Sequence, residues 1–175
     1  MRRRVAAIVL FLLLLAGGTG AAGKIVSAKF INDSTTMING FYAEDKNSID
    51  VLVVGSSNAF CTIDPLVLYE EEGIAAYDFC SSSQPMNLSL LYVKEAFKKQ
   101  TPKVVALEVN MIPAENITHI SENRLRWGLT DMPLTIDKLK CLYQSLGRVD
   151  AEYMSYVFPV LRYHGRWKEL SKQDY

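Results

Sequence analysis

Three short apolar runs, separated by segments with helical spacing, constrain the fold of this chain more than any other feature. The runs are IDVLVVG at 49–55, IAAYDF at 74–79 and KVVALEV at 103–109. Runs of this length, rich in β-branched residues, are typical of strands buried on both faces. The segments between them predict helices over 64–72 and 85–100. This alternation predicts an α/β fold with a parallel sheet, right-handed crossovers and the 49–55 strand in the middle.

The chain after the third run is mostly helical by pattern. Apolar residues recur at helical spacing over 136–147 and 151–167, and we expect no further buried strand. A parallel sheet of three strands is small, and its third strand would be an uncovered edge. We therefore expect an incomplete sheet with a helical C-terminal part, in a chain that is a fragment or comes from a truncated reading frame.

The N-terminus has the layout of an export signal. Three arginines, Arg2 to Arg4, precede an unbroken apolar run from Val5 to Ala16, and small residues follow from Gly17 to Gly23. The positive flank should stay in the cytoplasm, so that the rest of the chain lies on the extracytoplasmic face. A cleaved signal peptide and an uncleaved membrane anchor both fit the pattern. We divide the chain into this segment (1–23), a connector (24–48) and an α/β domain (49–175).

Charge and cysteine content exclude several classes of protein. Lys plus Arg and Asp plus Glu are 19 each, so no basic excess indicates a nucleic-acid partner. No group of residues has the spacing of metal ligands, and we expect no cofactor. Cys61, Cys80 and Cys141 allow one disulfide with one thiol left over, but we favour three buried thiols.

The carboxyl ends of parallel strands lie at one edge of a sheet, where ligand sites form. Three segments should therefore converge there: 55–61, 80–85 and 110–113. The first of them belongs to VVGSSNAF at 53–60, where a strand ends in glycine and is followed by two hydroxyls and an amide. A serine on such a turn has an exposed hydroxyl near free backbone N–H groups, as a nucleophile requires. Serine and asparagine are also favoured helix caps, and that simpler role remains open.

Four segments of the chain resemble the SGNH (GDSL-type) hydrolases. They are NSIDVLVVGSSNAF at 47–60, GIAAYDFCSSSQP at 73–85, KEAFKKQTPKVVALEV at 94–109 and RYHGRWKEL at 162–170. The resemblance is to the membrane-anchored bacterial branch, which includes D-alanine transfer proteins of teichoic acid and O-acetyltransferases of exopolysaccharides. It implies a flavodoxin-like, three-layer sheet.

The resemblance also implies roles for individual residues. Ser57 stands at the position of the family's nucleophile, and Ser56 replaces the aspartate of the G-D-S motif. Backbone N–H groups near Ser57 and Ser82 would hold the oxyanion, with Asn58 and Asn110 as supporting residues. The loop over 80–84 lacks the glycine that the family has there, and the G-x-N-D pattern around Asn110 is incomplete.

The family's paired aspartate and histidine have no counterpart in this chain. Its two histidines are His119 and His164, and neither follows an aspartate at the required spacing. The catalytic pair is absent or lies beyond residue 175. The resemblance implies an extracytoplasmic serine esterase or O-acyltransferase acting on acyl groups of cell-envelope polysaccharide. The alternative is a non-catalytic accessory domain that partners a membrane-bound O-acyltransferase.

Overall fold

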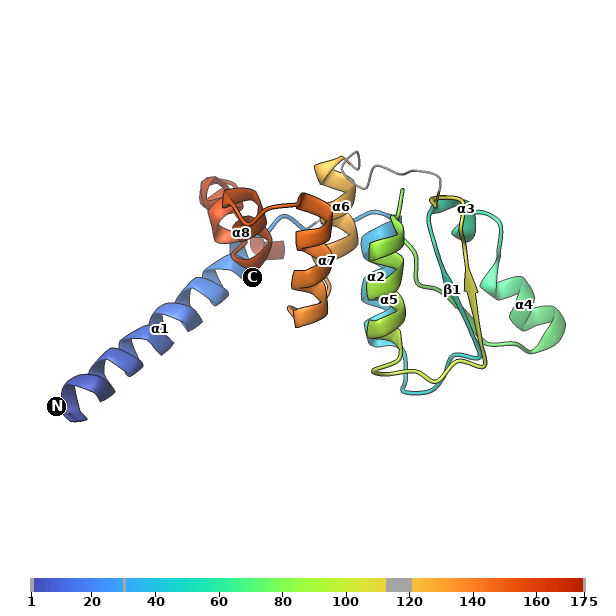
Figure 1. Cartoon of the computed structure of the whole chain (residues 1–175), viewed down its shortest axis with the longest axis horizontal. Helices are drawn as coiled ribbons and strands as arrows, with labels where there is room; N and C mark the ends of the chain where they lie inside the picture. Colours follow the sequence, from blue (N-terminus) through green and yellow to red (C-terminus); the bar gives the residue numbers. More distant parts are fainter. Residues whose placement is uncertain (1, 30, 113–120, 175) are drawn as a thin grey trace. The chain divides into compact units, whose positions relative to one another are not determined.

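The computed structural model describes residues 2–29, 31–112 and 121–174, and it divides into two units (Figure 1). Unit 1 joins the two ends of the chain, up to Lys29 and from Val149 onward. Unit 2 is the segment between them and contains the sheet.

The sheet of unit 2 has three parallel strands, as the sequence predicts. They are β1 (Val51–Val54), β2 (Ala76–Asp78) and β3 (Val104–Leu107), in the order β2-β1-β3. Leu52 in the central strand pairs with Tyr77 on one side and with Val105 on the other. This confirms both the parallel pairing and the central position of the first strand. Each strand is shorter than its apolar run.

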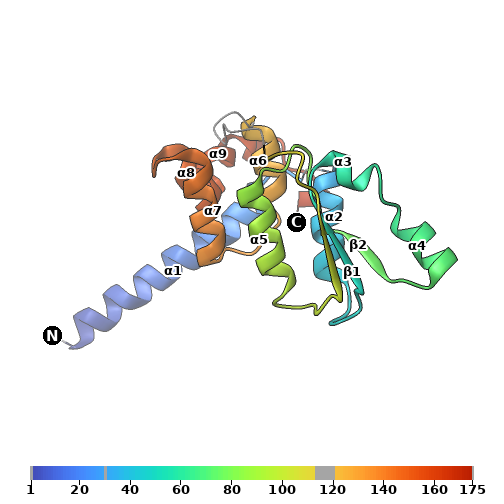
Figure 2. The same cartoon turned by 45° about the vertical axis from the view of Figure 1, so that its right-hand side comes forward.

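Helices lie on both sides of the sheet, as in an α/β fold, but they leave β2 half-buried and Val104 and Leu107 of β3 exposed. Helices α2 (Asp33–Ala43) and α5 (Met86–Ala96) lie on one side of the strands (Figures 1 and 2). The single turn α3 (Ser57–Phe60) and helix α4 (Pro65–Glu72) lie on the other. Helix α4 begins and ends at the predicted signals, because the Asp64 side chain caps its start and Gly73 ends it with a φ of 67°.

Helix α2 lies within the segment that we expected to be a connector. Its sequence, DSTTMINGFYA, contains few strong helix formers, so pattern and propensity do not reveal it. A capping box starts the helix: Asn32 Oδ1 accepts from Thr35 N–H, and Thr35 Oγ1 accepts from Asn32 N–H, both at 3.1 Å. Burial of Ile38 and Phe41 then holds it against the sheet.

Three stacked aromatic rings form the centre of the core on this face. The Phe41 and Phe79 rings lie 4.0 Å apart at 12°, and the Phe79 and Tyr92 rings lie 4.4 Å apart at 25°. All three side chains are fully buried. The Tyr92 hydroxyl donates to the Gly128 carbonyl at 2.8 Å, which satisfies the one polar atom in the stack. The stack thus joins α2, the end of β2 and α5 to the helix that contains Gly128.

Two further helices belong to unit 2 among the residues that the structure describes. Helix α7 (Ile136–Leu146) was predicted and ends at Gly147, whereas α6 (Glu122–Leu129) was not predicted. They pack against α5 and α2 respectively. The expectation of three buried thiols is wrong for Cys61, which is exposed after α3, while Cys80 and Cys141 are buried. All three cysteines are free thiols.

Unit 1 contains the long N-terminal helix and a group of short helices. Helix α1 spans Arg2–Val26, and the C-terminal group consists of α8 (Ala151–Val157), α9 (Val160–Tyr163), η2 (His164–Lys168) and η3 (Lys172–Asp174). The single helix expected over 151–167 is broken at Phe158. The residue before a proline avoids helical angles, and Pro159 has no N–H to donate to the preceding turn.

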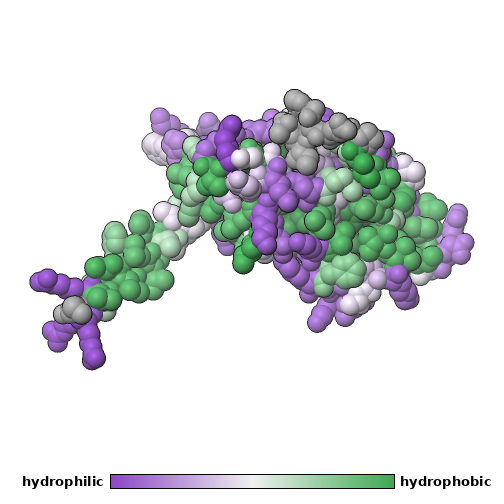
Figure 3. Space-filling model, viewed as in Figure 1, coloured by the Kyte–Doolittle hydropathy of each residue, from purple (hydrophilic) through white to green (hydrophobic). Residues whose placement is uncertain are grey.

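Helix α1 is long and apolar enough to cross a bilayer. An 18-residue window has a mean hydropathy of 2.3, and none of that window is buried. Figure 3 shows its apolar surface, with the arginines at its N-terminal end. This is consistent with the predicted membrane anchor or signal segment.

We predict that Gly40→Ala destabilises unit 2. A Cβ at Gly40 in α2 would collide with the Tyr77 hydroxyl, which donates to the Met37 carbonyl at 2.7 Å. Overpacking of this kind costs about 1–3 kcal/mol. Thermal unfolding of the detergent-solubilised chain, followed by near-ultraviolet circular dichroism, would measure the loss.

Tyr77→Phe removes the colliding oxygen, so the double variant should recover much of the stability lost by Gly40→Ala. Gly165→Ala is the control, because a Cβ there meets no atom within 4 Å. If Tyr77→Phe gives no recovery, the proposed collision is wrong.

Candidate functional site

The turn after β1 is tight because two side chains approach its glycine. A Cβ at Gly55 would collide with Glu108 Cβ and would lie 2.9 Å from Ala59 Cβ. Glycine is therefore required here by the close approach of β3 and α3. The chain can then pass directly from the buried strand into the serine pair at the carboxyl edge of the sheet, as the sequence predicts.

Ser56 is a structural residue in this turn. It is the N-cap of α3, its side chain accepts from Asn58 N–H at 3.4 Å, and only 2% of it is exposed. Its own N–H donates to Glu108 Oε2 at 2.8 Å. The simpler capping role that its residue type favours is therefore the role of Ser56 here.

Ser57 is the first residue of α3 and is half-exposed. Its carbonyl accepts from Cys61 N–H at 3.0 Å, which closes the single helical turn. Within the described part of the chain, no side chain donates to or accepts from the Ser57 hydroxyl. The hydroxyl therefore has no general base among the described residues. A helix of one turn also contributes only a small dipole.

Glu108 is the residue of this site that sequence reasoning missed. It directly follows β3 and holds the ends of two strands together through its carboxylate. Oε2 accepts from Ser56 N–H and Oε1 accepts from Asn110 N–H, each at 2.8 Å. Charge-assisted hydrogen bonds of this kind are about twice as strong as neutral ones. The signal in the sequence that could have identified Glu108 is an acidic residue near the end of the apolar run KVVALEV.

The polar groups of the loop after β2 are bonded to residues other than Ser57. Ser82 N–H, a predicted oxyanion donor, donates to Ser34 Oγ in the first turn of α2 at 2.9 Å. Ser81 Oγ donates to Gln84 Oε1 at 3.0 Å, and both residues are buried. Ser83 has a φ of 54°, so the loop turns through a left-handed residue without a glycine.

A pocket of about 570 Å³ opens beside the serine turn. Its wall is formed by Asn58 and Asn110, by Glu108, and by apolar side chains of β1, β3 and the α3 segment. Neither Ser57 nor Ser82 lines it. The structure thus brings Asn58 and Asn110 together at one pocket, next to the Ser57 turn. It does not bring Ser82 into that group.

Of the two histidines, one lies within the described residues, and it belongs to unit 1. His119 lies outside the described residues. His164 is exposed in unit 1, where its Nδ1 lies 3.1 Å from the Leu161 carbonyl oxygen. Among the described residues, no group of His, Cys, Asp and Glu is arranged to hold a metal ion.

Asp78, at the end of β2, is a second acidic residue that the sequence did not single out. It pairs in register with Val53, and its Oδ1 is buried without a hydrogen-bond partner among the described residues. Burial, followed by the charge of Asp64, raises the pKa of Asp78 to about 6. An ionisable group with such a pKa near a candidate site can change charge close to neutral pH.

Comparison with known protein families, with curated proteins and with solved structures finds no match for this chain.

We predict that Glu108→Ala destabilises unit 2 by about 1–2 kcal/mol, because two N–H groups lose a charged acceptor. Chemical unfolding in detergent measures the change. Glu71→Ala is the matched control, since Glu71 is exposed on α4. Equal stabilities of the two variants would contradict the bridging role of Glu108.

We predict that Asp78→Asn stabilises the chain at pH 7 and that this advantage disappears below about pH 4. The raised pKa means that the native state binds the proton of Asp78 more tightly than the unfolded chain does. In the unfolded chain, the pKa of an aspartate is about 3.9. The parent protein therefore loses stability as the pH rises from about 4 to about 6. Partial exposure and solvent screening reduce the effect to on the order of 1 kcal/mol or less.

Unfolding free energies at several pH values give the measurement. Asp45→Asn is the control, because Asp45 is exposed. A difference between Asp78→Asn and the parent protein that stays constant from pH 4 to pH 7 would contradict the assignment.

Proposed function

We propose that this chain is a membrane-anchored, extracytoplasmic domain that carries out acyl-ester chemistry at Ser57, on acyl groups of cell-envelope polysaccharide. The observation that carries the proposal is the position of Ser57. It is the second residue after Gly55 at the carboxyl edge of the central parallel strand, and it is half-exposed. This is where open α/β sheets place their reactive groups. The resemblance of 47–60 to the SGNH hydrolases supports the same assignment.

The pocket beside the turn supports an acyl substrate. Its apolar wall includes Val53, Ile63 and Ala106, and Asn58 and Asn110 add amide groups at its rim. Pockets of a few hundred Å³ with an apolar wall and few polar groups are typical of small-ligand sites. The apolar wall would hold the acyl group, and the two amides would contact the ester or a sugar hydroxyl.

In the proposed reaction, the Ser57 hydroxyl attacks the acyl carbonyl of an ester, and a base removes the hydroxyl proton. The ester C–O bond breaks, and the donor's alcohol leaves with that proton, so that the acyl group is bound to the serine. The acyl group is then transferred from the serine to water, which gives hydrolysis, or to a polysaccharide hydroxyl, which gives transfer. Because the described residues offer no base to Ser57, the base must come from elsewhere. General-base catalysis contributes about 10²- to 10⁴-fold, so without it turnover should stay near background.

We predict that this chain alone hydrolyses a chromogenic acetyl ester at close to the background rate. A longer chain that supplies a paired aspartate and histidine should be active, and Ser57→Ala should abolish that activity. Ser83→Ala is the matched control, because Ser83 is a half-buried serine in the neighbouring loop. Full activity of the Ser57→Ala variant would overturn the proposal.

A non-catalytic accessory role is the second candidate, and the contacts of Glu108 and Ser34 favour it. The N–H groups of Ser56 and Ser82 already have acceptors, and the carboxylate of Glu108 would repel an oxyanion at this turn. A domain of this kind would bind an acylated glycan or a membrane-bound O-acyltransferase without turnover. The same assay separates the two functions, because an accessory domain stays inactive in the longer chain.

A further inference from the structure

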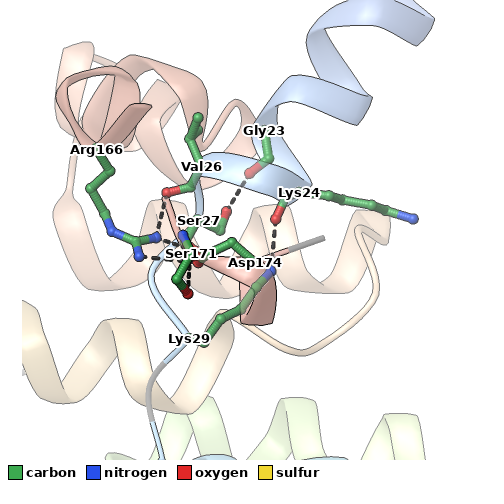
Figure 4. Close-up of polar contacts among 8 residues, drawn as sticks. All are labelled: Gly23, Lys24, Val26, Ser27, Lys29, Arg166, Ser171 and Asp174. Atoms are coloured by element: carbon green, nitrogen blue, oxygen red, sulfur yellow. Dashed lines mark hydrogen bonds and ion pairs between the residues drawn. The ribbon is translucent and has the colours of Figure 1, made fainter. Parts of the chain in front are cut away.

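The C-terminal end of α1 is held by donors from its own unit. Arg166 donates to the carbonyls of Val26 at 2.8 Å and Ser27 at 2.7 Å (Figure 4). The Ser27 hydroxyl donates to the Gly23 carbonyl at 2.6 Å, and Lys29 donates to the Lys24 carbonyl at 2.7 Å. The last carbonyls of a helix lack partners within the helix, and positive charge is favoured there.

Arg166 is itself fixed in this position. It pairs with Asp174 at 3.1 Å, and Asp174 also accepts from the N–H and hydroxyl of Ser171 at 2.9 and 3.1 Å (Figure 4). On the other side of the helix end, Gly23 lies against Pro159, whose Cδ would be 3.6 Å from an added Cβ. The segment 158–168 therefore packs at the end of α1.

The length of α1 places this end at the membrane surface, if α1 is the anchor proposed above. Arg4 and Lys24 are the charged residues that border the apolar part of the helix. At ~1.5 Å per residue they lie about 30 Å apart along the axis, which equals the thickness of the hydrocarbon core of a bilayer. With Arg4 at the inner surface, Lys24 and the segment packed beside it lie at the outer interface.

The residues of segment 158–168, FPVLRYHGRWK, suit that interface. Phe158, Leu161 and Trp167 are exposed, with Trp167 64% exposed. The segment contains Arg162, Arg166 and Lys168 and no acidic residue. Exposed aromatic and apolar side chains combined with basic ones are typical of segments that lie in the headgroup region.

We propose that segment 158–168 is a second membrane contact, in which Phe158, Leu161 and Trp167 insert into the outer interface and Arg162 and Lys168 bind anionic lipid headgroups. This second contact rests on the proposed anchoring of α1 and extends it. A membrane helix alone leaves the domain attached to it free to rotate. A second contact beside the helix would fix the orientation of the rest of unit 1 at the membrane surface.

The two tryptophans of the chain allow a direct test. Trp167 lies in the segment and Trp127 lies in α6 of unit 2, so Trp127→Phe and Trp167→Phe give matched single-tryptophan proteins. The full chain is reconstituted in mixed phosphatidylcholine and phosphatidylglycerol vesicles with lipids brominated near the headgroup or near the chain end. We expect shallow bromines to quench Trp167 more strongly than deep bromines do.

Two further measurements test the apolar and the basic side chains of segment 158–168 separately. Leu161→Ser should reduce the quenching of Trp167, while Leu66→Ser, an exposed leucine in unit 2, should not. Each basic residue favours the docked state by about fivefold at an anionic surface, so vesicles of phosphatidylcholine alone should quench Trp167 less. Equal quenching in both kinds of vesicle would overturn the assignment of anionic headgroups.

Flotation of the same vesicles separates this proposal from the anchoring of α1. Protein that floats with the vesicles but shows no quenching of Trp167 overturns the second contact and leaves the anchor in place. Protein that does not float overturns both.

Discussion

The stack of Phe41, Phe79 and Tyr92 is the contact on which unit 2 depends. It places one ring from each of α2, the end of β2 and α5 in a single buried column, with the Tyr92 hydroxyl bonded to α6. Loss of any ring would leave a cavity between these elements. The position of α2 matters beyond packing, because its first turn carries Ser34, which holds the loop after β2.

Glu108 determines what the serine turn presents to solvent. Its carboxylate holds N–H groups from the ends of β1 and β3, so the edge of the sheet carries a negative charge where acyl chemistry would need positive partial charge. Ser57 lies at the edge of the sheet, where a nucleophile would be expected. The neighbouring N–H groups of Ser56 and Ser82 already have acceptors. Catalysis at Ser57 therefore requires a base from elsewhere and a turn whose donors are released, whereas a binding role requires neither.

Unit 1 shows how a long apolar helix can be ended by its own domain. The carbonyls at the end of α1 are bonded to a serine, a lysine and Arg166, which is in turn paired with Asp174. Polar groups are costly inside hydrocarbon, so a helix end that is rich in them marks the level of the headgroups. In the proposed membrane arrangement, the exposed aromatic and basic residues of segment 158–168 would lie beside the bilayer.

The sequence by itself determined the parallel sheet and its central strand, a helix in each of the two segments between the strands, and the apolar N-terminal helix. These features follow from local periodicity, β-branched runs and caps, which act within a few residues of one another. It also placed Ser57 at the edge of the sheet. Only the tertiary structure decided that Ser82 is bonded to Ser34 and that Glu108 bridges two strand ends. It also decided that α2 forms inside the expected connector and that Arg166 caps α1. Each of these joins residues far apart in the chain or needs burial to form, and such contacts leave no local pattern to read.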